Sequence, residues 1–256
     1  MSAAPLGFKR VVLGLYPGAP SRAMDPAVAF AELLQIELLG LFIEDAGLRH
    51  LTGIPFAREI SSLGGAWRPV EASRALHDLD LAAGRAARRF DEAAQRLARR
   101  QFEVVRGGAA ESLASVSRSG DIVVIAAPAA AERFAEPFAS LIAAAFRSAA
   151  AVMLAPPRPA RHSGPIAAIA AGPDDPSVAV AAAIAAAAGE ELVVIDLAGD
   201  PALPEALRRI KERLAVATRG VLGVEIALAL AAALGVPVLS IDAGERRRFA
   251  DDCERE

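Results

Sequence analysis

The feature that most constrains this chain is an internal repeat of a strand, a glycine-proline turn, an alanine-rich helix and a second strand, about 150 residues apart. In the first copy these segments are residues 11–15, 17–21, 26–35 and 37–43, and in the second they are residues 166–170, 172–177, 178–188 and 191–197. A period of this length is too long for a solenoid repeat. It predicts two related α/β domains in tandem.

Short aliphatic runs alternate with longer helical patterns, which indicates βαβ units around a parallel sheet. In the first half the predicted strands are residues 9–15, 37–43, 102–106, 121–126 and 151–155, and the predicted helices are residues 24–35, 71–100, 110–119 and 131–148. In the second half the predicted strands are residues 166–170, 191–197, 213–217 and 237–241, and the predicted helices are residues 177–188, 203–212 and 223–234. The second half therefore has one strand and one helix fewer.

Each half is predicted to be a doubly wound parallel sheet, with strand order 3-2-1-4-5 in the first and 2-1-4-5 in the second. The lost third strand would be an edge strand, so its removal leaves a continuous sheet. A proline-rich link separates the halves. We predict domains at residues 1–157 and 165–243, a linker at residues 158–164 and a charged tail at residues 244–256.

A long segment without a clear pattern, residues 45–69, connects the second strand to the long helix. Connections of this length in a compact domain usually have a purpose. Its apolar residues Leu51, Ile54, Phe56 and Trp67 predict that it packs down on the protein. Two interpretations are open: a cover over the sheet edge or the sister domain, and a lid over a ligand pocket.

Composition limits the class of protein. The chain is 54% hydrophobic, which is ample for buried cores, and its net charge of −3 gives no overall attraction for nucleic acid or anionic lipid. The single cysteine, Cys253, excludes an intrachain disulfide and a cysteine metal cluster. The longest apolar run, residues 226–241, is interrupted by glycine and proline and is too short to cross a bilayer. We therefore expect a cytoplasmic protein that binds neither membrane nor nucleic acid.

The sequence shows no catalytic or metal-binding arrangement. Its three histidines, His50, His77 and His162, have no metal-ligand spacing, and neither a serine-hydrolase elbow nor a placed thiol nucleophile is present. Six arginines crowd residues 84–100, but Phe90 and Leu97 recur there at helical spacing as a buried stripe. We expect those arginines to lie on a solvated face.

The end of the second half carries the sequence LAVATRGVLG at residues 214–223, followed by an alanine-rich helix and VPVLSI at residues 236–241. A strand, a Ser/Thr-Arg-Gly turn, a helix and a Pro-Val-Leu strand in this order resemble the last βαβ unit of a universal stress protein, and both first units fit the same family. The resemblance implies two tandem Rossmann-like domains (flavodoxin-like, adenine-nucleotide alpha-hydrolase-like), the second truncated and degenerate. In that family dimers often pair through their last strands, so residues 151–155 and 237–241 are expected to join the halves as an intramolecular pseudo-dimer.

Nucleotide-binding members of the family carry Gly-x2-Gly-x9-Gly-Ser/Thr after the fourth strand and an Asp at the end of the first strand. Glycines let backbone N–H groups approach a phosphate, and a helix N-terminus faces its charge. In the second half the four motif positions are Gly220, Gly223, Ala233 and Leu234, and in the first half they are Ala126, Ala129, Ala139 and Ser140. The Asp position falls on Tyr16 and Ala171, so neither half has a complete motif.

The candidate nucleotide-binding residues are therefore Thr218, Arg219, Gly220, Gly223, Gly172 and Ser140. The alternative is that Gly220 and Gly223 only shape a turn between strand and helix. Asp174 and Asp175 in the neighbouring loop would repel phosphate, which favours this alternative.

The resemblance implies a universal stress protein-like regulatory or binding protein in the stress response, with degenerate nucleotide sites and no catalytic turnover. Such a protein would act through a protein partner or a small ligand. The alternative is a protein that binds ATP or AMP with magnesium at the loop 218–223, with weak ATPase activity. A structural homo-oligomer is a third class, and a homodimer is compatible with each of them.

Overall fold

The computed structural model describes most of the chain. The described residues are 7–16, 24–45, 47, 50, 54, 56, 58–59, 66–69, 71–126, 136–156, 161–197 and 211–242. Three predicted segments lie wholly or partly outside this set: residues 158–160 of the linker, residues 203–210 of the helix 203–212, and the whole tail 244–256.

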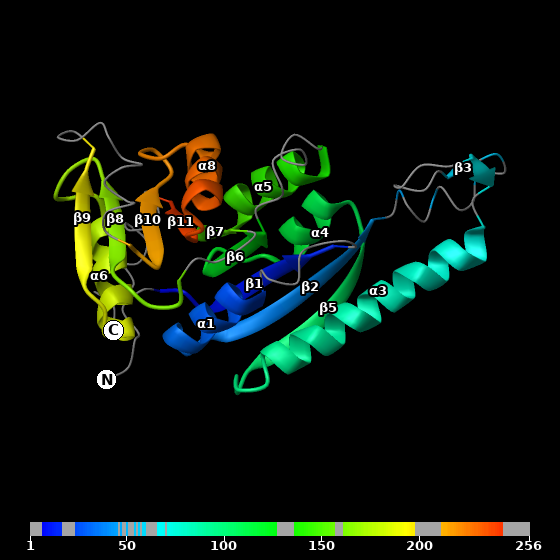
Figure 1. The fold of residues 1–256 in the computed structure, drawn as a ribbon, viewed down its shortest axis with the longest axis horizontal. Coiled ribbons are helices and arrows are strands. Elements are labelled where there is room, and N and C mark those ends of the chain that lie inside the picture. Colours follow the sequence, from blue (N-terminus) through cyan, green and yellow to red (C-terminus); the bar gives the residue numbers. More distant parts are fainter. Residues whose placement is uncertain are drawn as a thin grey trace.

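The centre of the molecule is a nine-stranded sheet (Figure 1). The first half of the chain contributes β1 (Arg10–Leu15), β2 (Glu37–Asp45), β5 (Arg100–Gly107), β6 (Asp121–Ala126) and β7 (Ala151–Ala155). The second half contributes β8 (Ile166–Ala170), β9 (Leu192–Asp196), β10 (Leu214–Thr218) and β11 (Val238–Ile241). The order across the sheet is β5-β2-β1-β6-β7-β11-β10-β8-β9. Leaving aside the small β3–β4 pair described below, the strands of each half lie in the predicted order.

The two halves meet at the only antiparallel pairing within this sheet as described. Strands β7 and β11 pair with Leu154 opposite Val238 and Ala151 opposite Ile241, whereas the neighbouring strands within each half are parallel. The predicted contact between the last strands is confirmed. Because the junction is antiparallel, the carboxyl ends of the strands of the two halves lie at opposite edges of the sheet.

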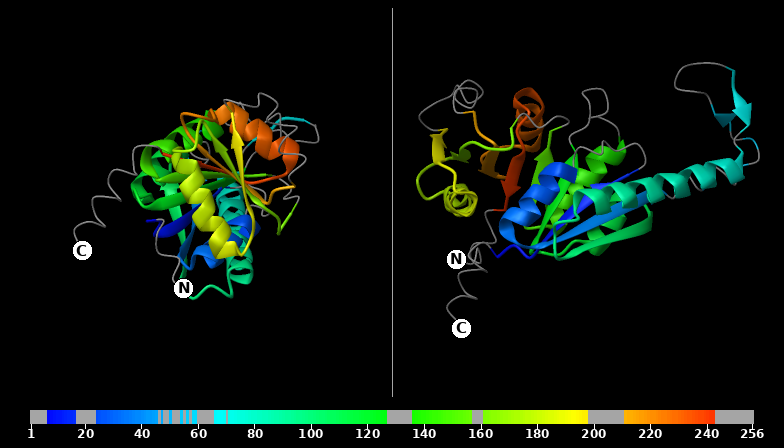
Figure 2. Two further views of the ribbon diagram at one scale, coloured as in Figure 1. Left: turned by 90° about the vertical axis from the view of Figure 1, so that its left-hand side faces the viewer. Right: turned by 60° about the horizontal axis from the view of Figure 1, so that its bottom comes forward.

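Helices cover both faces of the sheet (Figures 1 and 2). On one face lie α1 (Met24–Leu34), α3 (Ala72–Ala93) and α6 (Pro176–Ala188), and on the other lie α4 (Ala109–Val116), α5 (Glu136–Ser148) and α8 (Val224–Leu234). Each face has its own hydrophobic core. Burial on both faces explains why β6, β7 and β8 are apolar runs apart from Asp121 at the start of β6.

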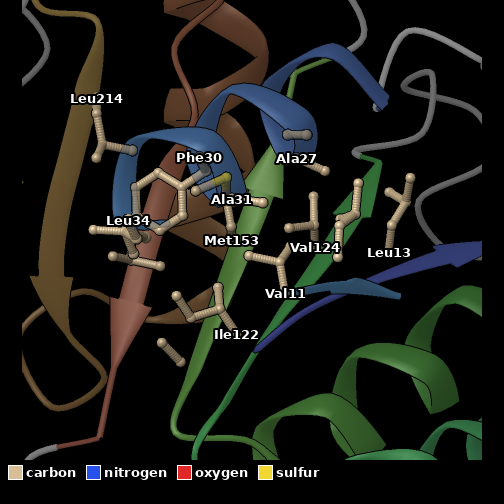
Figure 3. Packing of buried hydrophobic residues seen from close by; sticks show 14 of the residues in the cluster. Val11, Leu13, Ala27, Phe30, Ala31, Leu34, Ile122, Val124, Met153 and Leu214 are labelled. Atoms are coloured by element: carbon tan, nitrogen blue, oxygen red, sulfur yellow. The ribbon is translucent and has the colours of Figure 1, made fainter. Parts of the chain in front are cut away.

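The core beneath α1 crosses the junction between the halves (Figure 3). Phe30 of α1, Met153 of β7 and Leu214 of β10 are 5%, 1% and 4% exposed and belong to one cluster. The first helix therefore packs on strands from both halves of the chain.

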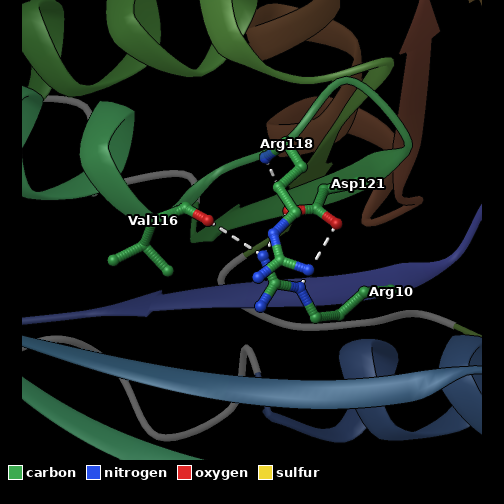
Figure 4. A network of polar contacts seen from close by, with 4 residues as sticks. All are labelled: Arg10, Val116, Arg118 and Asp121. Carbon is green, nitrogen blue, oxygen red and sulfur yellow. Dashed lines mark hydrogen bonds and ion pairs between the residues drawn. The ribbon is translucent and has the colours of Figure 1, made fainter.

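The amino ends of β1 and β6 are joined by a buried ion pair (Figure 4). Arg10 donates from Nη2 to Asp121 Oδ2 at 2.7 Å and from Nε to Oδ1 at 3.2 Å, and Nη2 also donates to the Val116 carbonyl at 2.9 Å. The hydrogen bond to Asp121 outweighs burial and raises the pKa of Arg10. This bidentate pair fixes the register of two central strands.

Several boundaries differ from the prediction by one to three residues, and the largest difference among the described residues lies at the end of the long helix. Helix α3 ends at Ala93, not at residue 100, because the chain turns at residues 94–96, with the Leu97 N–H donating to the Ala94 carbonyl at 2.9 Å. Strand β5 begins at Arg100, which pairs with Leu38, before its predicted start at residue 102. The arginines of this region lie exposed, and Phe90 and Leu97 are buried as predicted.

The prediction that residues 45–69 pack down is wrong for the side chains that the structure describes. Ile54, Phe56 and Trp67 are 45%, 89% and 61% exposed, and Leu51 lies outside the described residues. The segment contains a two-stranded sheet of β3 (Arg58–Glu59) and β4 (Arg68–Pro69). Figure 1 shows β3 beyond the end of α3, away from the main sheet. Neither the cover nor the lid is therefore supported.

Candidate functional site

The second half has a switch point between β8 and β10, where the chain connections leave in opposite directions. Strand β8 leads to β9 through α6, which lies on one face of the sheet. Its neighbour β10 leads to β11 through α8, which lies on the other face. Ligands of doubly wound sheets bind outside the carboxyl ends of the strands at such a point. The loops 171–175 and 219–223 form this edge and contain most of the predicted site residues.

The carboxylate of Asp175 caps the N-terminus of helix α6. Its Oδ1 accepts from the Ser177 N–H at 2.9 Å, and its Oδ2 accepts from the Ala171 N–H at 3.1 Å. Pro176 has no N–H, and the Val178 N–H donates to the Asp175 carbonyl at 3.0 Å. The donors that a phosphate would seek in this first turn are therefore already satisfied within the chain.

The charge of Asp175 is stabilised. Burial raises the pKa of its carboxyl group, but the hydrogen bonds from the Ser177 and Ala171 amides and from the Thr218 hydroxyl outweigh burial and lower the pKa below its ordinary value. Asp175 is therefore ionised at neutral pH and places a negative charge at the switch point.

Thr218 is directed at this carboxylate. Its side chain is buried, and Oγ1 donates to Asp175 Oδ2 at 3.4 Å. Its carbonyl accepts from the N–H groups of Val221 and Leu222 at 3.1 and 3.0 Å, which turns the loop back on itself. The hydroxyl predicted to bind nucleotide is thus used inside the protein.

The three predicted glycines leave open space. A Cβ atom at Gly172, Gly220 or Gly223 would meet no heavy atom within 4 Å, and none of the three has a positive φ. Gly223 is the N-cap of α8, where no side chain caps the helix. The backbone does not require glycine at these positions, and the start of α8 remains accessible.

Arg219 contacts the other half of the chain. Its guanidinium donates to the carbonyls of Phe146 and, at 2.9 Å, Ala149, and its Cζ lies 4.7 Å from the centre of the Phe146 ring. Nη1 is also 3.6 Å from Asp242 Oδ2. Arg219 therefore holds the carboxyl end of α5 against β10 and β11.

Ser140 is not brought to this site. It lies in the first half of α5, which follows β6, whereas Arg219 contacts the last turn of that helix. Because the halves are antiparallel, the carboxyl ends of β6 and β10 lie at opposite edges of the sheet. The loops 17–23 and 127–135, which would form the switch point of the first half, are outside the described residues.

Sequence reasoning identified Asp175 as a repulsive charge but not as a helix cap. An Asp before a Pro-Ser pair at the start of an alanine-rich run is the usual signal of such a cap and could have revealed it. No motif signalled the contact of Arg219 with the end of α5, since it joins residues 70 and 73 positions apart.

Solved structures with a related fold match nearly the whole length of this chain. A Pseudomonas aeruginosa PAO1 protein of unknown function matches with a TM-score of 0.55 and 15% identity over 100% of both chains. A Pseudomonas aeruginosa UCBPP-PA14 protein provisionally assigned to the universal stress proteins matches with a TM-score of 0.53 and 13% identity, over 99% of this chain and 100% of that one. An Archaeoglobus fulgidus DSM 4304 universal stress protein matches with a TM-score of 0.51 and 11% identity, over 92% and 97%.

The fold is that of universal stress proteins. No protein-family model and no curated protein sequence matches the chain. None of the described helices has the length and apolar character needed to cross a membrane. Among the described residues, no group of three or more His, Cys, Asp or Glu side chains could hold a metal ion.

Proposed function

We propose that this chain is a universal stress protein-like regulatory or binding protein of the cytoplasm that acts in the stress response without catalytic turnover and without ATP or AMP at the switch point of its second half. The observation that carries this proposal is the Asp175 carboxylate, which accepts two backbone N–H groups and the Thr218 hydroxyl. Its partner would be a protein or a small ligand.

Electrostatic repulsion opposes the binding of a nucleotide at this edge of the sheet. Two like unit charges 4 Å apart repel by about 1 kcal/mol in water and about 4 kcal/mol at an effective dielectric constant of 20. A triphosphate beside loop 219–223 would approach an ionised Asp175 that is already hydrogen-bonded to Thr218. Arg219 could offset this charge, but its guanidinium already donates hydrogen bonds to the Phe146 and Ala149 carbonyls at the end of α5.

Turnover is also unsupported at this edge. The hydroxyls of Thr218 and Ser177 are 3% and 0% exposed, and both donate hydrogen bonds within the chain. A nucleophile must reach its substrate, and these two groups are covered.

Isothermal titration calorimetry with ATP and with AMP, each with magnesium, tests the proposal. We expect no saturable heat for the wild type. Asp175→Asn removes the charge but retains a capping side chain, so a gain of ATP binding is expected in this variant and not in Asp78→Asn, a control at an exposed aspartate of α3. Micromolar binding of ATP by the wild type would overturn the proposal.

The second candidate is an ATP- or AMP-binding protein that uses loop 218–223, with weak ATPase activity. The observation in its favour is the open start of α8, where Gly220 and Gly223 leave room and no side chain caps the helix. The φ of −64° at Gly223 accommodates any residue. Replacing both glycines by leucine should therefore leave the fold intact, and only this candidate predicts that nucleotide binding is lost.

A further inference from the structure

A cavity lies where the two halves meet, between α1 and α6 and at the amino ends of β8 and β10. Its volume is about 120 Å³. Its apolar lining includes Phe30, Leu33, Met153, Ile166, Ile184 and Leu214. Figure 3 shows three of them, Phe30, Met153 and Leu214, directed toward one another beneath α1. The cavity therefore has a hydrophobic floor made by both halves.

The floor consists of packed, buried side chains, and the space above it is small. Met153, Ile166 and Ile184 are at most 1% exposed and belong to the same core cluster. An apolar protein cavity of about 150 Å³ accepts a benzene ring. The space between α1 and α6 is smaller, at about 120 Å³, so a single ring or a short branched chain would fill it and extend into the opening, with any polar part of the ligand there.

The polar residues at the opening include two guanidinium groups, each near a carboxylate of the chain, Glu190 for Arg213 and Glu212 for Arg161. Arg161, His162 and Arg213 line the cavity, and Asp25 is the one carboxylate among the described lining residues. Arg213 is 22% exposed at its side chain, and its Nη1 lies 3.7 Å from Glu190 Oε1, which also accepts the Gly164 N–H at 3.1 Å. A guanidinium presents a planar pair of donors that matches a carboxylate.

We infer that this cavity binds a small monocarboxylate with an apolar body of about the size of benzoate. The ring would lie against Leu33 and Phe30, close to the buried Met153, and the carboxylate would face Arg161 and Arg213. This inference goes beyond the proposed function and rests on other residues. Ile166 and Leu214 begin the strands whose carboxyl ends lead to the Asp175 site, so nucleotide binding and carboxylate binding can fail independently.

Methionine-methyl NMR tests the inference with benzoate as the probe. The chain has three methionines, of which Met153 lines the cavity, and Met153→Leu assigns its signal. We expect benzoate to shift the Met153 methyl resonance saturably through its ring current. Benzylamine, which has the same ring and the opposite charge, should bind at least about tenfold more weakly. An unmoved Met153 signal, or equal affinity for the two probes, would overturn the inference.

Three variants and a control locate the site. Arg161→Gln and Arg213→Gln each remove one charged donor, and at least one should weaken benzoate binding about tenfold. Ala29→Phe places a ring in the cavity from α1 and should abolish binding. Arg89→Gln, at an exposed arginine of α3, should leave the affinity unchanged. Unchanged affinity in both arginine variants of the cavity overturns the inference even if Ala29→Phe fails to fold.

Discussion

Arg219 offers the sharpest test of how the two halves are held together. Its guanidinium donates to the carbonyls of Phe146 and Ala149 at the end of α5 and stacks on the Phe146 ring. We predict that Arg219→Met, which keeps most of the apolar stem, lowers the free energy of unfolding by about 3 kcal/mol. A cation at this position also complements the negative end of the helix dipole.

The magnitude follows from the separate contacts. A hydrogen bond from a charged donor contributes about 1.5–3 kcal/mol, and a cation over an aromatic ring contributes about 0.5–1 kcal/mol at a partly exposed site. The Arg219 side chain is 23% exposed, so the lower values apply, and contacts of one side chain are not fully additive. The ion pair with Asp242, a residue 47% exposed at its side chain, adds at most about 1 kcal/mol.

Urea denaturation followed by far-UV circular dichroism measures this loss. In a chain of this size about 3 kcal/mol corresponds to a melting temperature lower by roughly 6–12 °C. Arg147→Met, at an exposed arginine in the last turn of the same helix, is the matched control and should change the free energy by less than about 0.5 kcal/mol. A loss below about 1 kcal/mol in Arg219→Met would refute the claim that this side chain joins the halves.

Three further predictions follow from close contacts and from ionisation. A Cβ at Gly40 would lie 2.7 Å from a buried phenylalanine ring, so Gly40→Ala should cost about 1–3 kcal/mol by urea denaturation. Gly14→Ala, whose nearest contact is 3.9 Å, is its control. Asp121→Ala leaves Arg10 without its buried partner and should cost about 3–5 kcal/mol in the same assay. The folded-state pKa of Asp175 lies below its unfolded value, so its stabilisation is full above about pH 4 and is lost as the pH falls through the folded pKa. The difference in unfolding free energy between the wild type and Asp175→Asn should therefore shrink on acidification, and a difference that is independent of pH would contradict this.

The central strands could be predicted from sequence because their burial leaves a simple pattern. Strands β6, β7 and β8 have the predicted bounds, since helices cover both faces and every position is apolar apart from Asp121. The end of α3 could not be predicted in this way. Residues 94–99 retain helical composition, but the pairing of Arg100 with Leu38 in the sheet draws the chain out of the helix.

The candidate site was only partly predictable. The spacing of the glycines after the strand predicted the loop from Thr218 to Gly223 at the end of β10. This was possible because a strand followed by glycines and an apolar helix is a local pattern. The engagement of Arg219 with α5 depends on the antiparallel pairing of β7 with β11, which brings distant segments together. Exposure of Phe56 and Trp67 could not be predicted either, because an apolar side chain gives no sign of whether a partner surface lies within reach.

The length of strand β10 separates the two places where a ligand could act. Ile166 and Leu214 line the cavity at the amino ends of β8 and β10, and Thr218 ends β10 beside Asp175. Four residue steps along β10 at about 3.3 Å each put the two regions roughly 13 Å apart. A ligand in the cavity therefore shares no contact with the Thr218 hydroxyl, and any effect of benzoate on the second site would have to pass through a strand whose side chains are all buried. Because that strand is fixed by parallel neighbours on both sides, the two sites are expected to titrate as independent units.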